Sequence, residues 1–480
     1  MLPIKNLLIG LSLLVASGSL VAIELPDMGS SADSVLSPQD SQRLGEAFMR
    51  QVRKHLTLVD DPEIILYLQT LGERLVQNST LAGQHFTFFL VKDRAINAFA
   101  APGGFIGIHT GLILATQAES ELAGVLAHEI SHITQNHLSR SIESAGQLNI
   151  PMAVALVAAL LLGGDNPAAG QAALAAATAG SAQYQINFTR EHEQEADSVG
   201  IDLLATSHFN PHGMTAFFSR LQKSSQYGPD VPEFLRTHPM TTNRMAESQA
   251  RADQYPYQQI ADSFGYRLMH AKLRSLLYDQ PEQAVQEFKR LLVNKQYREV
   301  NSERYGYALS LYLAKDLNAA RTEISALLTT HPDQIEFITL AAKIEQAANN
   351  PTLAKRMYQQ ALAVYPHNAL LTQAYIDVLL LNKEAAVAYP LALQLSQQSP
   401  TQSIYQQLIT ACSLLNRVAE AHAYQAEYYY LQNDLMAAIT QLNIALQQPG
   451  IDTFATIRWR ARRETLQQEW RQAEKKNTLP

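Results

Sequence analysis

Apolar residues near the start of the chain recur at the spacing of a helix. In residues 61–78, Ile64, Leu68 and Leu75 follow one another at four- and seven-residue intervals, so their side chains fall on one helical face. Residues 41–53 have the same periodicity. Two amphipathic helices are therefore predicted in this part of the chain.

The apolar pattern then changes to that of β-strands. Residues 86–91, with the sequence Phe-Thr-Phe-Phe-Leu-Val, predict one strand, and residues 97–108 predict two strand segments around the turn sequence Pro102-Gly103-Gly104. A strand at the edge of this sheet could hold an extended peptide through main-chain hydrogen bonds, which would tolerate many side chains. An ordinary hairpin is the alternative.

A segment without charges follows. Residues 150–162 are uncharged, and a Gly-Gly-Asp-Asn-Pro break separates them from the alanine-rich residues 168–179. A helix over 150–162 would span about 20 Å, which is less than the roughly 30 Å of a bilayer core. We expect a helical hairpin that packs on the neighbouring helices, with contact to a membrane surface or a role as a mobile lid as alternatives.

From residue 262 the pattern predicts helices alone, arranged as a repeat. Pro332, Pro366 and Pro400 are 34 residues apart, which is the period of the tetratricopeptide helix pair. The positions 12 and 24 residues before each proline are Ala308, Ala320, Ala342, Ala354, Ile376 and Ala388. All but Ile376 are alanine, whose small side chain lets two antiparallel helices approach closely. Residues 262–456 are therefore predicted to form a solenoid that presents a concave surface to partner proteins.

The two ends of the chain have distinct compositions. Residues 1–22 combine Lys5, an apolar stretch and small residues at the end, which is typical of a cleaved signal peptide. Residues 457–480 are basic; a solvated capping helix is the simpler interpretation, and contact with an anionic membrane is the alternative. The single cysteine, Cys412, excludes an intrachain disulfide. We expect export to a periplasm, as a soluble or peripherally membrane-associated protein.

Overall composition limits the possible functions. A net charge of -7 and a pI near 6.1 give no reason to expect nucleic-acid binding. A hydrophobic content of 47% is that of a globular protein and not of a polytopic membrane protein.

The sequence His128-Glu129-Ile130-Ser131-His132 carries the candidate chemistry. Histidines four residues apart on a helix lie on one face, so both imidazoles can bind one metal ion. The carboxylate of Glu129 can then take a proton from the water that attacks a peptide carbonyl. This H-E-x-x-H arrangement is typical of zinc peptidases, although manganese or cobalt can occupy similar ligands.

A catalytic zinc site needs a third protein ligand. Glu193 and Asp197 are again four residues apart, so Glu193 could bind the metal while Asp197 accepts a hydrogen bond from a ligand imidazole. His137 lies five residues after His132, a spacing that does not fit the metzincin pattern, and is interpreted as a surface histidine or one behind the ligands.

The two motifs together resemble peptidase family M48, the Ste24-like gluzincins. In that family the glutamate of the E-x-x-A-D motif, here Glu193, is the third zinc ligand, and the Arg236-Thr237-His238-Pro239 segment resembles the family's histidine-proline motif. The resemblance implies an α+β metallopeptidase domain, mainly helical with a small sheet, over residues 23–261. It also implies one Zn²⁺ per chain. His238 is either a fourth zinc ligand that keeps the enzyme latent or a catalytic group that stabilises the oxyanion.

The resemblance further implies a function in outer-membrane protein assembly. Substrates would be unfolded or misassembled outer-membrane β-barrel proteins, and the repeats would bind the β-barrel assembly machinery. The alternative is a chaperone or assembly scaffold built on the repeats, with proteolysis latent or secondary.

Overall fold

The computed structural model describes residues 36–144, 190–227, 232–256, 258–432 and 434–477. The predicted signal peptide and the predicted helical hairpin at 150–179 lie outside the described residues. Among the helices described, none is both long enough and apolar enough to cross a bilayer.

Both N-terminal helices form as predicted. α2 (Pro38–His55) and α3 (Pro62–Val76) each begin with a proline in the first turn, where its missing N–H costs no hydrogen bond. The side chain of Ser37 accepts from the amide of Asp40, and Asp61 caps α3 in the same way.

The predicted strands form a small three-stranded sheet in the order β1-β3-β2. β1 (Thr87–Val91) pairs in parallel with β3 (Phe105–His109), which pairs antiparallel with β2 (Ala98–Ala101). The turn between β2 and β3 is the short helix η1 (Pro102–Gly104), where Gly103 and Gly104 have φ angles of 75° and 80° that favour glycine. β2 is thus an edge strand of this sheet.

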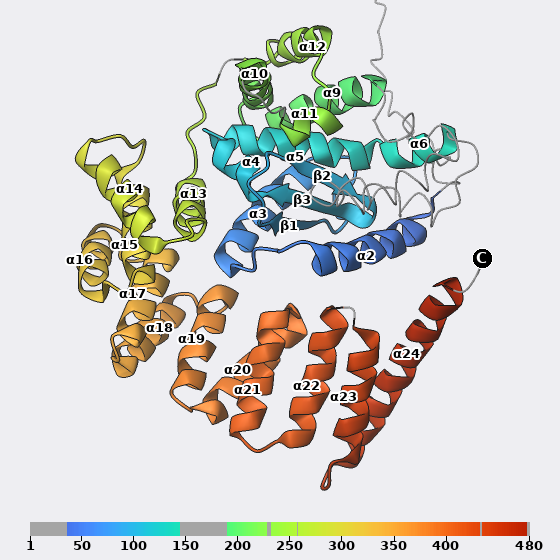
Figure 1. Cartoon of the computed structure of the whole chain (residues 1–480), viewed down its shortest axis with the longest axis vertical. Coiled ribbons are helices and arrows are strands. Elements are labelled where there is room, and N and C mark those ends of the chain that lie inside the picture. The colour runs from blue at the N-terminus through green and yellow to red at the C-terminus, as the bar shows by residue number, and fades with distance from the viewer. Residues whose placement is uncertain (1–35, 145–189, 228–231, 257, 433, 478–480) are drawn as a thin grey trace, which may run out of the picture.

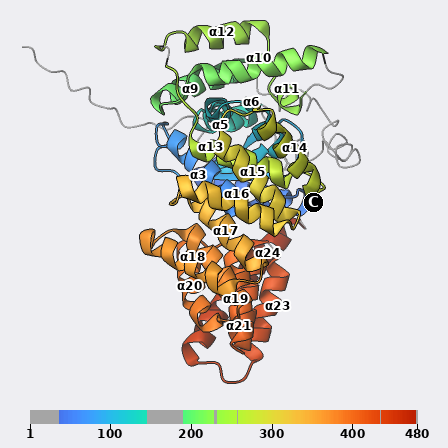
Figure 2. The ribbon, with the colours of Figure 1, turned by 90° about the vertical axis from the view of Figure 1, so that its left-hand side faces the viewer.

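Helices lie on both sides of the sheet (Figures 1 and 2). α2 lies below it and α5 (Glu119–Thr134) above it, and a further layer of helices covers α5. The remaining helices of this domain are α4 (Thr110–Ala115), α6 (His137–Ser144), α9 (Arg190–Thr206), α10 (His212–Tyr227), α11 (Glu233–Thr237) and α12 (Thr242–Ala252). α9 approaches α5 closely at Gly200, where a Cβ atom would lie 3.2 Å from the amide nitrogen of His128. Glycine at this position lets the two motif-bearing helices meet.

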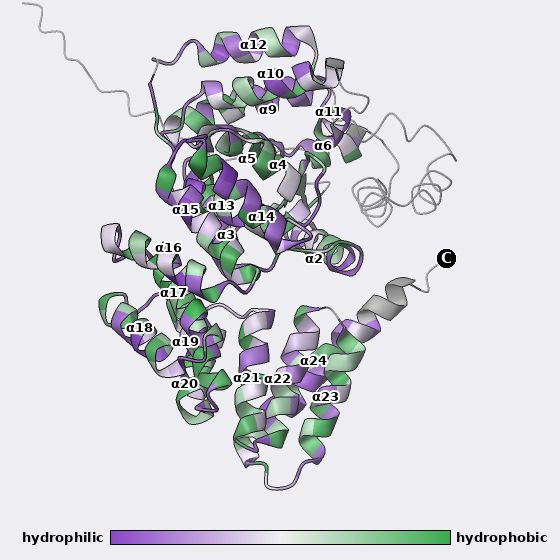
Figure 3. Cartoon of the chain, turned by 60° about the vertical axis from the view of Figure 1, so that its left-hand side comes forward, coloured by the Kyte–Doolittle hydropathy of each residue, from purple (hydrophilic) through white to green (hydrophobic). Residues whose placement is uncertain are grey.

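The second half of the chain is an array of antiparallel helix pairs that curves beneath the first domain (Figure 1). Its helices are α13 (Phe264–Leu276), α14 (Pro281–Val293), α15 (Val300–Leu313), α16 (Leu317–Thr330), α17 (Ile335–Ala347), α18 (Pro351–Val364), α19 (Ala369–Leu381), α20 (Ala385–Gln398), α21 (Gln402–Leu414), α22 (Val418–Leu431), α23 (Leu435–Gln447) and α24 (Thr453–Asn477). Green and purple residues alternate along most of these helices in Figure 3, as expected where one face is buried. The predicted fold class is confirmed.

The small residues predicted at the helix crossings are buried. Ala308, Ala320, Ala342 and Ala354 are each 0% exposed, and so is Tyr358, whose ring packs in the same cluster as Ala354. The basic helix α24 begins at Thr453, before the predicted residue 457, and buries Trp459 and Leu466 against the preceding pair. This helix therefore covers the end of the array.

Hydrogen bonds join the N-terminus of α5 to the N-terminus of α13 at the junction of the two halves. Ala118 stands at the N-cap of α5, where its side chain cannot accept a hydrogen bond, and Asp262 accepts instead from the amide of Glu119 at 2.6 Å. In return, the carboxylate of Glu119 accepts from the amide of Ser263, at the N-cap of α13, at 2.8 Å. The array is thus fixed to the end of the helix that carries the H-E-x-x-H motif.

Replacing Asp262 with Ala is expected to lower the free energy of unfolding of the full chain by about 1–2 kcal/mol, since it removes the cap acceptor of α5. Urea denaturation measures the change. Asp279 is the control because its side chain is 91% exposed, so Asp279→Ala should change the same quantity by less than about 0.5 kcal/mol. Equal effects of the two substitutions would contradict the capping role given to Asp262.

Candidate metal centre

The H-E-x-x-H motif lies in the buried middle of α5. His128, Glu129 and His132 are 0 to 3% exposed, and the neighbouring Leu126 and Ile130 are fully buried. The helical spacing brings Nε2 of His128 within 3.0 Å of Nε2 of His132. Both imidazoles therefore direct the same nitrogen toward one point.

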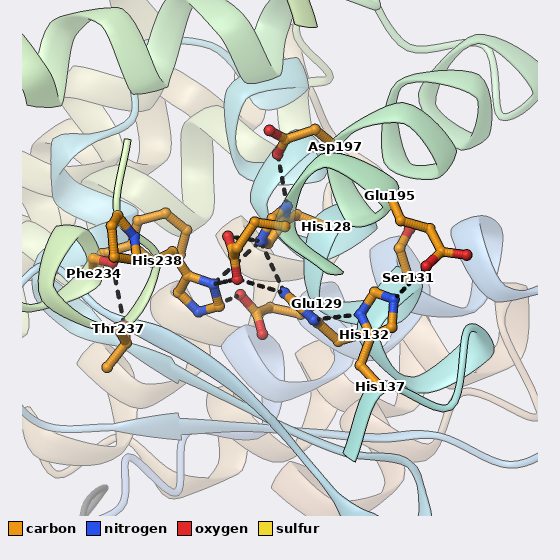
Figure 4. A network of polar contacts seen from close by, with 12 residues as sticks. His128, Glu129, Ser131, His132, His137, Glu195, Asp197, Phe234, Thr237 and His238 are labelled. Carbon is orange, nitrogen blue, oxygen red and sulfur yellow. Dashed lines mark hydrogen bonds and ion pairs between the residues drawn. The ribbon is translucent and has the colours of Figure 1, made fainter. Parts of the chain in front are cut away.

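Glu193 from α9 and His238 from the end of α11 complete a group of four side chains (Figure 4). Nδ1 of His238 lies 2.9 Å from Oε1 of Glu193 and 3.3 Å from Nε2 of His128, and Nε2 of His132 lies 3.4 Å from Oε1 of Glu193. Four ligands around zinc at about 2.0–2.1 Å would be roughly 3.3 Å apart. The spacing of these donor atoms therefore suits a tetrahedral ion.

The donor chemistry of this group also suits a metal ion. Three imidazole nitrogens and one carboxylate oxygen lie within 4.8 Å of one another, and all four side chains are buried. Nitrogen and carboxylate ligands in a tetrahedral set are typical of zinc. Burial would lower the pKa of His128, but hydrogen bonds with Asp197 and Glu193 outweigh it and raise that pKa to about 9. The carboxylates of Asp197 and Glu193 thus favour positive charge at the position of His128.

Asp197 lies behind His128, as the sequence predicts for a residue that orients a ligand. Its Oδ1 is 3.0 Å from Nδ1 of His128, on the side of the ring opposite the other ligands. Arg244 from α12 contacts the same carboxylate through Nε at 2.5 Å and also contacts Glu193 through Nη1 at 2.5 Å. Burial would raise the pKa of Asp197, but its hydrogen bonds with Arg244 and His128 outweigh burial and lower it. Asp197 therefore stays ionised.

Glu129 lies beside the four-residue group and outside it. Oε1 of Glu129 is 3.6 Å from Nε2 of His238. Burial raises the pKa of Glu129, although the charges of His238 and His128 and the nearby backbone of Ala100 in the edge strand β2 act to lower it. A carboxylate with a raised pKa between the metal ligands and an edge strand is placed to exchange a proton with a reacting group there.

His137 is behind the ligands and not on the surface. Its Nδ1 is 2.8 Å from Nδ1 of His132, and its Nε2 is 3.1 Å from Oε2 of Glu195. Burial lowers the pKa of His137 to about 4, so its ring is neutral at physiological pH.

Sequence reasoning missed Arg244 and Glu195. Arg244 carries no motif of its own in a single sequence, since its importance comes from contacts with Asp197 and Glu193 that only the fold creates. Glu195 lies between two predicted site residues and looked like one more charge on a solvated helix face.

The fold and the site together define a metallopeptidase: a buried H-E-x-x-H helix over a small sheet, with a carboxylate supplied by a second helix. The model of peptidase family M48 matches residues 65–252, which contain all of these elements. The chain belongs to this family.

Relatives match nearly the whole chain. The putative beta-barrel assembly-enhancing protease of Vibrio cholerae is 34% identical over 92% of this chain and 92% of its own length, and the beta-barrel assembly-enhancing protease of Escherichia coli K12 is 32% identical over 92% and 91%. The mitochondrial metalloendopeptidase OMA1 of Schizosaccharomyces pombe is 26% identical over 38% of this chain and 50% of its own. A solved tetratricopeptide repeat protein from Parabacteroides merdae covers 56% of this chain and 91% of its own, at 12% identity and a TM-score of 0.29, which is too low to assign a fold.

Proposed function

We propose that the chain is a zinc endopeptidase in which His128, His132 and Glu193 bind the ion. The observation that carries this proposal is the convergence of these three donors, with His238, on one buried point. Asp197 would fix the ring of His128, and Arg244 would hold Asp197 and Glu193 in their ionised forms. When bound, zinc would supply Lewis acidity toward a peptide carbonyl and its attacking water.

Glu129 would act as the general base in peptide hydrolysis. Its carboxylate would accept a proton from the attacking water and deliver it to the leaving amine nitrogen. The raised pKa favours the first transfer, because a carboxylate whose pKa is closer to neutrality takes up a proton more readily, and the acid it forms is still strong enough to protonate an amine. The edge strand β2 would hold the substrate in an extended conformation, and the backbone of Ala100 next to Glu129 would bring the scissile bond near the base.

His238 would keep the enzyme latent. A catalytic zinc site leaves a fourth position open for water, whereas here Nδ1 of His238 lies with the other donors and would close the site. His238 lies in the loop between α11 and α12, residues 238–241. This loop is held by stacking of the His238 ring on Phe234, with ring centroids 4.7 Å apart, and by a hydrogen bond from Arg244 to the carbonyl of Pro239. Release of this loop would open the site.

The substrates would be unfolded or misassembled outer-membrane β-barrel proteins in the periplasm. This part of the proposal is supported by the match of about 92% of the chain to beta-barrel assembly-enhancing proteases. The helical array would bind the β-barrel assembly machinery, since stacked helix pairs present extended surfaces to protein partners. A scaffold that uses this array, with proteolysis secondary, is the second candidate function.

The direct test is to measure the zinc content of the purified full chain and its cleavage of an unfolded outer-membrane β-barrel protein on gels. One zinc per chain and discrete fragments are the expected results. A chain that binds zinc in the four-donor site but never cleaves, even after substitution of His238, would favour the scaffold. A chain that binds no zinc would contradict the proposed metal site.

A further inference from the structure

His137 is placed by a tight turn directly after the metal-binding helix. α5 ends at Thr134, and Asn136 takes a φ of 53°, a left-handed conformation that asparagine tolerates better than most residues. α6 continues beyond the end of α5 in Figure 1, and the turn orients its first residue, His137, toward His132 (Figure 4). His137 is 0% exposed at this position.

The contacts of His137 form a chain from the metal site to a carboxylate on α9. Nδ1 of His132 lies 2.8 Å from Nδ1 of His137, whose Nε2 lies 3.1 Å from Oε2 of Glu195. Arg140, one turn further along α6, contacts the same oxygen at 2.7 Å. The carboxylate of Glu195 is thus held between two side chains of α6.

The direction of each hydrogen bond follows from the donor atoms of the metal site. His132 turns Nε2 toward the other donors, 3.0 Å from Nε2 of His128, and a nitrogen that binds a metal must offer its lone pair. Nδ1 of His132 therefore carries the proton and donates to Nδ1 of His137. The proton of the His137 ring is then on Nε2 and donates to Glu195, which can only accept when ionised.

We infer that His137 is a positioning residue for His132, holding it in the tautomer that binds metal through Nε2, and that Glu195 in turn fixes the tautomer of His137. The inference rests on the proposed zinc site. It makes the two ligand histidines unlike: His128 meets a carboxylate directly at Asp197, whereas His132 reaches its carboxylate through a second imidazole. Partners of this kind hold the ligand ring in place and tune its basicity.

His137→Phe tests this chain, because phenylalanine keeps an aromatic ring that can stack on His192, 4.5 Å away, but can neither accept nor donate. Zinc affinity of the full chain, measured by competition with a chelator, should fall about 10- to 100-fold. His137→Gln should recover much of the loss, since its amide can accept from His132 and donate to Glu195. Ser139→Ala, at a buried position of the same helix, should bind zinc like the wild type.

Circular dichroism and urea denaturation of the metal-free variants separate positioning from a merely structural role. The inference predicts similar metal-free stability of His137→Phe and His137→Gln but different zinc affinity. It is overturned if His137→Phe binds zinc as tightly as the wild type, or if both variants lose affinity only in proportion to lost metal-free stability. A wild-type chain that binds no zinc would instead refute the proposed metal site itself.

Discussion

Cleavage of an unfolded protein by the full chain is expected to fall about 10²- to 10⁴-fold when Glu129 is replaced by Gln, the range that general-base catalysis contributes. Glutamine has nearly the same shape and remains polar, but it cannot take a proton from water. Glu129 is outside the four-donor group, so one zinc per chain should remain bound. Initial rates on casein and zinc content measured on the same preparation check both statements.

Glu121→Gln is the matched control for this variant. Glu121 is also a buried carboxylate of α5, 5% exposed, but it pairs with Arg220 near the start of the helix. Its replacement should reduce stability without a comparable loss of cleavage per folded, zinc-bound molecule. If Glu129→Gln kept most of the wild-type rate with zinc bound, Glu129 would not be the base.

The same variant separates the two candidate functions in cells. A protease loses its contribution to outer-membrane protein quality control when Glu129 is replaced, whereas a scaffold that works through the helical array keeps it. A cell that lacks the chain and is complemented equally by wild type and Glu129→Gln would favour the scaffold.

Local patterns predicted most of the fold because they reflect local physics. The period of residues 61–78 predicted α3, the Pro-Gly-Gly sequence predicted the turn between β2 and β3, and prolines 34 residues apart predicted the helix pairs. The cap that Asp262 supplies to α5 could not be predicted. Ala118 signals only that a local cap is missing, and the substitute comes from the far side of the domain junction.

The candidate site likewise contains residues that the sequence predicts and residues that only the folded structure brings to it. His128, Glu129, His132, Glu193 and Asp197 were predicted because metal chemistry favours fixed spacings within a helix, whereas His238 was predicted only from the resemblance of its segment to the histidine-proline motif of family M48. Arg244 was missed because its role depends on the packing of α12 on α9, which no spacing in the sequence encodes. His137 was left between two interpretations, since only the left-handed turn at Asn136 shows that it faces inward.

His238→Ala is expected to accelerate cleavage about tenfold or more. If the closed arrangement of His238 is favoured by a few kcal/mol, the open form makes up about 0.1–10% of molecules, and removing the imidazole makes every molecule open. Zinc should stay bound, since His128, His132 and Glu193 still supply the three protein ligands of a catalytic site. Initial rates of casein cleavage at equal zinc content measure the effect.

His212→Ala is the matched control, because His212 lies at the start of α10 and does not belong to the four-donor group; its rate should equal that of the wild type. The double variant with Glu129→Gln should be inactive, which would show that the accelerated cleavage uses the same base. A slower His238→Ala enzyme with zinc bound would contradict the latent state. It would instead make His238 a catalytic group, since Nε2 of His238, 3.6 Å from Oε1 of Glu129, is also placed to stabilise an oxyanion that forms beside the base.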